Sequence, residues 1–304
     1  MTTDNRAETK LAATDKVSNP KVTKAVIKAH GLVLKKSLGQ NFLTDQNILH
    51  HIVSAAELDA SKGALEIGPG IGALTQHLAE AAGAVVAVEI DQRLIPILSD
   101  TMAPYPNANV VHGDVLKTNL RDLWDRYFTE CSAVSVVANL PYYVTTPIIM
   151  KLLEEKLPLE NIVVMIQREV AERMSAKPGT KAYGSLSIAV QYYCVPEIVK
   201  IVPPTVFVPP PNVESAVIRL RLRDKPPVET DDEGYLFEVI QACFVQRRKT
   251  ISNNLLAFCG KDRRTGVEAA LAAAGIDPSR RGETLSLEEF ARLSRALAEA
   301  NRSS

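Results

Sequence analysis

Short apolar segments alternate with helical patterns between Leu65 and Leu222, and this alternation limits the fold more than any other feature of the chain. Near-continuous apolar strands separated by helices form a parallel sheet whose two faces are both covered. The pattern therefore predicts an α/β domain. We expect strands at residues 64–67, 84–90, 110–111, 134–138 and 162–166, and helices at residues 73–82, at residues 92–102 and from residue 147.

Two later segments, residues 187–195 and 215–222, also have strand patterns. Because they are close in sequence, we expect an antiparallel hairpin at the sheet edge, which would complete a main domain over residues 36–223. Residues 224–227 have the composition of a linker. Residues 229–304 predict a small all-α domain, since leucine, phenylalanine and alanine recur there at helical spacing.

Residues 1–35 are polar and predict a flexible N-terminal tail. The alternative for its Lys35-Lys36 end is a basic arm that contacts phosphates.

Composition narrows the class of protein without naming a function. The 304 residues are 46% hydrophobic, which allows a sizeable core. Cationic and acidic residues are equal at 35 each, which argues neither for nor against nucleic acid. The four cysteines include no CxxC pair, which indicates a reducing compartment and no zinc site. No apolar stretch has the length of a membrane span. We expect a cytoplasmic protein without a metal or a membrane partner.

A glycine-rich loop, Gly68 to Gly72, lies between the first expected strand and its helix. Glycines at spacing two let the backbone pass close to a ligand. Glu89 ends the next strand, where a carboxylate can accept hydrogen bonds from ribose hydroxyls. Asp114 follows the third strand, from which a side chain can reach an adenine amine. A glycine loop alone is equally typical of a tight turn, but these groups all follow strands of one sheet and therefore meet at one edge.

The tetrad Asn139-Leu140-Pro141-Tyr142 follows the fourth expected strand and is suited to hold a base with an exocyclic amine. The Asn139 side-chain oxygen and the Leu140 carbonyl can accept the two amine protons. Pro141 fixes the turn, and Tyr142 can stack on the base. An amine held in this way directs its lone pair at an electrophile. The alternative for Tyr142 is an ordinary core aromatic. Tyr143 is expected to pack and not to stack on the base.

The glycine loop has the form GxGxG after Glu66, which resembles the S-adenosylmethionine loop of class I methyltransferases and not the GxGxxG of nicotinamide enzymes. From Lys35 to Leu287, the chain resembles the bacterial small-subunit ribosomal RNA adenine N6,N6-dimethyltransferases. The resemblance rests on Gly39 to Leu43, Glu66 to Gly72, Val88 to Asp91, Gly113-Asp114, Asn139 to Tyr142, Gln167 to Arg173, Phe207 to Val213 and Phe244 to Thr250.

The resemblance implies a fold, a cofactor and a set of site residues. The fold is a Rossmann-like class I methyltransferase sheet, mostly parallel with an antiparallel edge strand, followed by the helical domain. The cofactor is S-adenosyl-L-methionine, contacted by Asn41, Leu43, Gly68, Glu89, Asp114 and Asn139. The target adenine, extruded from its stack, is held by Asn139, Leu140, Pro141 and Tyr142 and closed on its other face by Phe207. Simple loop packing remains the alternative for Phe207.

The activity implied by the resemblance is dimethylation of the N6 amines of two adjacent adenines, in a loop near the 3′ end of small-subunit (16S) ribosomal RNA. The implied partner is the immature small subunit, and we expect a monomer. One alternative is a ribosome-assembly factor whose binding matters more than methyl transfer. Another is a DNA or antibiotic-resistance RNA adenine methyltransferase, which the C-terminal helical domain disfavours. A nicotinamide oxidoreductase leaves the tetrad unexplained.

Three adjacent cations, Arg247, Arg248 and Lys249, are expected on the first helix of the C-terminal domain. A short charge run is usually a solvated face. We nevertheless favour contact with RNA phosphates, which positions RNA without reading its sequence. Arg219, Arg221 and Arg223 alternate and therefore share one face of the last expected strand.

Overall fold

The computed structural model describes residues 16–32 and 41–302. The chain divides into two compact units, one formed by residues up to 168 with residues 197–221, and one by residues 169–196 with residues from 222 onward. The domain limits expected at 36–223 and 229–304 stay a prediction.

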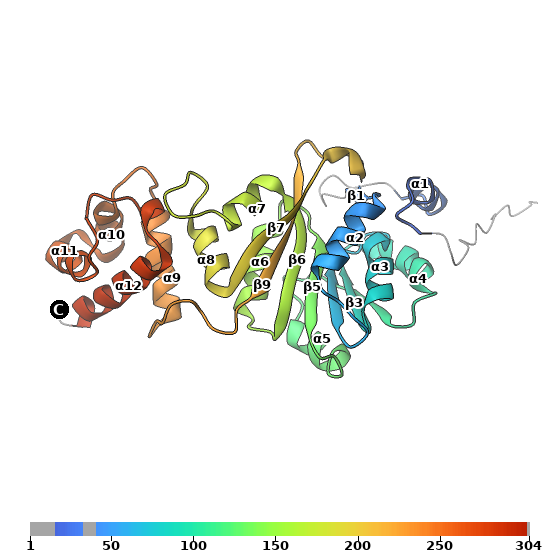
Figure 1. The fold of residues 1–304 in the computed structure, drawn as a ribbon, viewed down its shortest axis with the longest axis horizontal. Coiled ribbons are helices and arrows are strands. Elements are labelled where there is room, and N and C mark those ends of the chain that lie inside the picture. The colour runs from blue at the N-terminus through green and yellow to red at the C-terminus, as the bar shows by residue number, and fades with distance from the viewer. Residues whose placement is uncertain (1–15, 33–40, 303–304) are drawn as a thin grey trace, which may run out of the picture. The chain divides into compact units, whose positions relative to one another are not determined.

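A seven-stranded sheet is the centre of the first unit (Figure 1). Its order is β4-β3-β2-β5-β6-β9-β7. Neighbours from β4 to β6 pair in parallel, and β9 pairs with β6 in the antiparallel sense. This arrangement confirms the expected mostly parallel sheet. The bounds are β2 Gly63–Ile67, β3 Ala84–Glu89, β4 Ala108–His112, β5 Val134–Asn139, β6 Leu159–Gln167, β7 Cys194–Val202 and β9 Ser215–Leu222.

Helices cover both faces of this sheet, because every residue of β2 is buried and so are the first five residues of β5. Aliphatic side chains of α2 and α3 pack against the strands in one hydrophobic cluster. The helical segments up to the end of β6 are α2 Gln46–Ala55, α3 Ala73–Ala81, η2 Gln92–Leu94, α4 Ile95–Met102, α5 Leu120–Tyr127 and α6 Thr145–Glu154.

The expected strand at residues 187–195 is wrong, because residues Ser185–Tyr193 form helix α8 and the strand β7 begins only at Cys194. Most side chains of α8 are buried, so its apolar run lacks the polar face that identifies an amphipathic helix. A short buried helix and a buried strand cannot be distinguished by periodicity. The expected edge position holds for the following strand, since β7 lies next to β9 at the end of the sheet.

Part of the expected flexible tail is a helix, α1, over Pro20–Ala29. Asn19 caps it by accepting a hydrogen bond from the backbone N–H of Lys21, and proline stands in its first turn. Val17, Val26 and Leu32 pack with a hydrophobic cluster that includes residues of η2 and α4. A mostly polar composition concealed these three apolar anchors. Residues 1–15 and 33–40, which include Lys35 and Lys36, lie outside the described residues.

A two-stranded ribbon joins segments from the two ends of the first unit. Strand β1, Phe42–Leu43, pairs with β8, Phe207–Val208, in the antiparallel sense. The short helix η3, Pro204–Val206, precedes β8.

The second unit is helical, as expected for the C-terminal region. Its core is one hydrophobic cluster around Tyr183, Tyr192 and Phe290. The helices are α8, α9 Glu233–Phe244, α10 Ile251–Cys259, η4 Lys261–Arg263, α11 Arg264–Ala273, η5 Gly282–Thr284 and α12 Leu287–Arg302, and α7 Arg168–Met174 precedes them.

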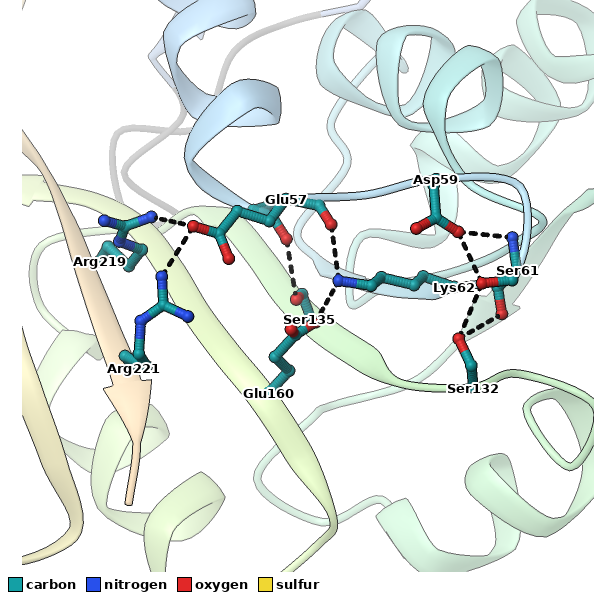
Figure 2. A network of polar contacts seen from close by, with 10 residues as sticks. Glu57, Asp59, Ser61, Lys62, Ser132, Ser135, Glu160, Arg219 and Arg221 are labelled. Carbon is teal, nitrogen blue, oxygen red and sulfur yellow. Dashed lines mark hydrogen bonds and ion pairs between the residues drawn. The ribbon is translucent and has the colours of Figure 1, made fainter. Parts of the chain in front are cut away.

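The arginines of β9 form ion pairs with glutamates of the protein. Arg219 pairs with Glu57 at 2.6 Å and with Glu197 at 2.6 Å. Arg221 pairs with the same Oε1 atom of Glu57 at 2.7 Å, and Lys62 donates to the Glu57 carbonyl (Figure 2). These pairs tie β9 to the loop between α2 and β2, so the shared face of Arg219 and Arg221 serves the fold.

Arg219→Ala should lower the free energy of unfolding by about 1 kcal/mol, because it leaves two carboxylates without their shared cation. The loss should shrink at high salt, which screens exposed charges. Denaturant titration of the two proteins at low and high salt measures both effects. Arg121→Ala, at an exposed α5 position, is the matched control. A loss that salt does not change would show that the network contributes by packing alone.

Candidate active site

A pocket opens at the carboxyl ends of β2, β3 and β5, where strand order reverses. Parallel α/β sheets bind ligands at this position. The pocket contains about 850 Å³ of empty space, including a part open to solvent. Five of the predicted cofactor residues line it, namely Asn41, Leu43, Gly68, Glu89 and Asn139. The remaining members of the tetrad, Leu140, Pro141 and Tyr142, line it as well.

The glycine loop leaves space for a ligand at Gly68, and the missing side chain at Gly70 leaves space for the ring of Phe42. Gly68 has a φ of +70°, and a Cβ there would meet no atom of the described residues within 4 Å, so they leave space beside this backbone. Gly70 has a φ of +63°, and a Cβ there would come within 2.9 Å of the Phe42 ring. Side chains at either position would be strained, and at Gly70 they would also displace the pocket wall.

Glu89 is held rigidly by backbone N–H groups. Its Oε2 accepts from Gly70 at 3.1 Å, and its Oε1 accepts from Asp91 at 2.8 Å. Burial raises the pKa of this carboxyl, while the N–H donors of Asp91 and Gly70 oppose the rise. The glycine loop and the end of β3 are therefore fixed to each other through one side chain.

Glu66 is a pocket residue to which the sequence assigned no role. It is 1% exposed, and its Oε2 has no hydrogen-bond partner among the residues that the structure describes. Burial raises its pKa to about 8; the Thr75 hydroxyl opposes this rise and the Glu89 carboxylate adds to it. A buried polar atom without a partner costs free energy unless a ligand or water satisfies it. The signal was present in the sequence, since an acid is the penultimate residue of the strand that leads into the glycine loop.

The orientation of the Asn139 amide is set by another pocket residue. Its Nδ2 donates to the backbone carbonyl of Asn41 at 3.1 Å, which leaves Oδ1 as an acceptor that no described residue contacts. The backbone N–H of Leu140 donates to Met165 at 3.1 Å. Among the described residues, no donor contacts the carbonyl oxygen of Leu140. Two acceptors are therefore available at the end of β5.

Tyr142 is half-buried, and its hydroxyl shares a 2.7 Å hydrogen bond with the Ser215 hydroxyl at the start of β9. Burial raises the pKa of the Tyr142 phenol, and the bond to Ser215 opposes this rise. Because the ring is anchored at its far end, Tyr142 is a fixed wall of the pocket.

Two predicted site residues lie away from the pocket wall. Phe207 is 3% exposed and packs in the cluster that contains Leu43. That placement agrees with the packing alternative for Phe207. Asp114 follows the outer strand β4, is half-buried, and accepts through Oδ1 from the backbone N–H of Leu116 at 3.0 Å. The roles predicted for both residues stay predictions.

The basic run is not on a helix, because α9 ends at Phe244 and residues 245–248 form turns. Arg247 donates through Nη2 to the carbonyls of Lys181 and Tyr183 at 2.9 and 3.1 Å, and it pairs with Glu283 at 3.5 Å. Arg248 and Lys249 are exposed, and among the described residues neither has an ion-pair partner. Arg247 therefore differs from Arg248 and Lys249, because its guanidinium contacts carbonyls and a carboxylate of the protein.

Metal and membrane features are not found in the described residues. Over residues 16–32 and 41–302, no group of three or more His, Cys, Asp or Glu side chains is arranged to hold a metal ion. None of the helices in the same ranges is long and apolar enough to cross a membrane.

A family model described as ribosomal RNA adenine dimethylase matches residues 31–299. A protein of Shouchella clausii named ribosomal RNA small subunit methyltransferase A is 58% identical over 282 residues, which are 92% of this chain and 95% of that protein. The protein of the same name from Anoxybacillus flavithermus is 57% identical over 283 residues, 92% of this chain and 96% of that protein.

Two solved structures share the fold. A dimethyladenosine transferase from Plasmodium falciparum has a TM-score of 0.71 and 27% identity, covering 86% of this chain and 98% of that one. The 23S rRNA methyltransferase ErmE has a TM-score of 0.63 and 30% identity, covering 85% of this chain and 100% of that one.

Glu66→Gln should change how stability depends on pH. The carboxyl titrates near its ordinary value of 4.5 in the unfolded chain and at about 8 in the folded protein. Between these values the folded protein holds a proton that the unfolded chain releases, so Glu66 costs stability increasingly as pH rises from about 5 to about 8. The stability of the variant relative to the original should therefore rise across this window. Denaturant titration of the ligand-free proteins measures it.

The exposed Glu130→Gln is the matched control and should leave the pH profile unchanged. If Glu66→Gln has the same pH profile as the original protein, Glu66 is ionised in the folded state at neutral pH.

Proposed function

The chain belongs to the ribosomal RNA adenine dimethylase family, and we propose that it dimethylates the N6 amines of two adjacent adenines near the 3′ end of small-subunit ribosomal RNA, with S-adenosylmethionine as methyl donor. Its fold is that of the class I methyltransferases. The small-subunit relatives are 57–58% identical, against 30% for the 23S enzyme, which favours the small-subunit substrate. This preference disfavours the antibiotic-resistance alternative.

The observation that carries the proposal is the fixed pair of acceptors at Asn139 and Leu140. The N6 amine of adenine has two protons, and its lone pair is delocalised into the ring. Asn139 Oδ1 and the Leu140 carbonyl can accept one proton each, which holds the amine and favours a lone pair directed out of the ring plane. The Asn41 carbonyl keeps the amide from turning its NH₂ toward the base.

The pocket fits a cationic nucleoside cofactor. When bound, S-adenosylmethionine supplies an electrophilic methyl group on a positively charged sulfur. Among the described residues, the lining contains two buried carboxyl groups, Glu66 and Glu89, and no lysine, arginine or histidine. No other described residue pairs with Glu66 Oε2 or fills the space beside Gly68, so both can receive a ligand. We assign cofactor binding to Asn41, Leu43, Gly68, Glu66, Glu89 and Asn139. We also assign it to Asp114, which follows β4 at the same sheet edge.

Tyr142 is assigned to stack on the extruded adenine. The bond to Ser215 limits the freedom of the ring before the base arrives, so less entropy is lost when the base binds. Pro141 holds the turn, as its carbonyl accepts from the backbone N–H of Val144 at 3.2 Å. Stacking on a prepositioned ring offsets part of the cost of taking the base out of the RNA.

We assign RNA contact in the second unit to Arg248 and Lys249. Both are exposed cations without a carboxylate partner among the described residues, which suits phosphate contact. Arg247 is assigned a supporting role, because its guanidinium fixes the backbone at Lys181 and Tyr183. The proposal also includes the immature small subunit as substrate, a monomeric enzyme and a cytoplasmic location.

The activity is tested with tritiated S-adenosylmethionine and small ribosomal subunits that lack adenine dimethylation. The RNA is then digested and the labelled nucleoside identified. Label in N6,N6-dimethyladenosine is the expected result. Label in another nucleoside, or none while the cofactor binds, would reject the assigned reaction and would leave the assembly-factor alternative.

Asn139→Ala should reduce methyl transfer by about 100-fold or more, because one of the two fixed acceptors is lost. Binding of the small subunit should stay near that of the original protein, since no charge is removed. Single-turnover transfer and a filter-binding assay measure the two properties. Asn109→Ala, at an exposed position of β4, is the matched control. Normal transfer by Asn139→Ala would disprove the role of the amide.

Replacing both Arg248 and Lys249 by alanine should weaken binding to the small subunit and reduce the slope of log K against log salt by about 1.5. Arg247→Ala should instead lower the melting temperature and leave this slope nearly unchanged. Binding measured at several salt concentrations, together with thermal unfolding, separates the two effects. An unchanged slope for the double variant would show that both residues are solvated and do not contact RNA phosphates.

A further inference from the structure

Tyr143 is an exposed aromatic at the rim of the pocket. Its side chain lines the pocket, yet 58% of the residue is accessible to solvent. The expectation that it packs is therefore wrong, because the turn at Pro141 directs Tyr142 inward and leaves the next side chain outside. In the described part of the first unit, no other large aromatic residue is exposed in this way.

The backbone under Tyr143 is rigid. The Pro141 carbonyl accepts from the backbone N–H of Val144 at 3.2 Å and from the Thr145 hydroxyl at 3.2 Å. Helix α6 begins at Thr145, directly after the turn. The Tyr143 hydroxyl has no hydrogen-bond partner among the described residues. A ring on a fixed backbone with a free face costs little entropy when it stacks against a ligand.

We propose that Tyr143 is a second stacking platform, which holds the base of the nucleotide next to the target adenine. The proposal rests on the proposed function, because it needs an RNA strand with one base in the pocket. Extruding one base breaks the stack on both of its sides and leaves an apolar face on each neighbour. Tyr142 and Tyr143 are consecutive residues, so a base on Tyr143 lies beside the pocket entrance as the adjoining nucleotide of the strand would.

The chemistry of the rim favours a nucleobase over an apolar protein partner. Protein docking surfaces are contiguous apolar patches. The exposed large apolar residues that line this pocket are Tyr143 and Ile90, and Tyr143 is followed along the chain by half-buried Val144 and exposed Thr146. A single aromatic ring beside a polar helix start offers a π face, which every base can use regardless of its sequence.

The test is a double-mutant cycle between the protein ring and the RNA base. Binding is measured for a hairpin RNA with two adjacent adenines in its loop, and for the same RNA lacking the base on the 5′ or the 3′ side of the target. Tyr143→Ala should bind the intact RNA about fivefold to tenfold more weakly, as expected for one exposed stack. Removing the partner base should weaken the original protein equally and should not weaken the variant further.

Tyr143→Phe is the conservative control and should behave as the original protein, because only the ring is needed. Unchanged thermal unfolding of Tyr143→Ala should accompany its loss of affinity. If Tyr143→Ala and removal of the base weaken binding independently, so that their fold-losses multiply at both the 5′ and the 3′ position, the proposal is wrong. Methyl transfer by the original protein to small subunits that lack adenine dimethylation is measured in parallel. Transfer with multiplying losses rejects the Tyr143 platform alone, whereas absence of transfer to the subunits rejects the proposed function.

Discussion

The parallel pairing of β2 with β5 is the interaction on which the site depends. Strand order reverses here, because β3 and β4 extend the sheet on one side and β6 extends it on the other. The register places Glu66 beside Val137, so the glycine loop and the tetrad leave the sheet at neighbouring positions. A slip of one residue would turn the side chains of one of the two strands to the other face, so Glu66 and Asn139 would no longer share a face of the sheet. The donor and acceptor groups of the pocket are therefore held by backbone hydrogen bonds of the sheet and not by loop contacts alone.

Electrostatics then distinguishes this pocket from the anion sites common in α/β proteins. Helix α3 begins at the glycine loop without a side-chain cap, as in sites that bind phosphate. Here, however, the strand ends contribute Glu66 and Glu89, and both are buried. Burial raises the pKa of both carboxyl groups, so an anionic ligand would disfavour their ionisation further, whereas a cationic ligand would favour it. The two buried carboxyl groups are therefore what distinguishes this glycine loop from a phosphate site.

The sequence predicted the features that rest on local pattern and missed those that rest on tertiary contacts. The parallel strands, the glycine loop and the tetrad follow from apolar periodicity and from residue types at strand ends. Helix α8 was mistaken for a strand because burial on all sides removes the helical period. Helix α1 was missed because its few apolar anchors depend on a surface supplied by α4. The sequence does not show the exposure of Tyr143 or the carbonyl contacts of Arg247 for the same reason, since no local pattern shows which way a turn directs a ring or which carbonyls a guanidinium reaches.

The ribbon of β1 and β8 has a consequence for how the protein is made. Phe42 lies against Gly70 but is held in a strand whose partner is Phe207–Val208, and Tyr142 is anchored by Ser215. The wall of the pocket thus needs residues that are translated more than a hundred positions after the glycine loop. During synthesis from the N-terminus, a nascent chain that ends before residue 207 contains the glycine loop and the tetrad but lacks the partner of β1 and the Ser215 anchor of Tyr142. The wall of the pocket is therefore completed late in translation, when β8 and β9 have left the ribosome.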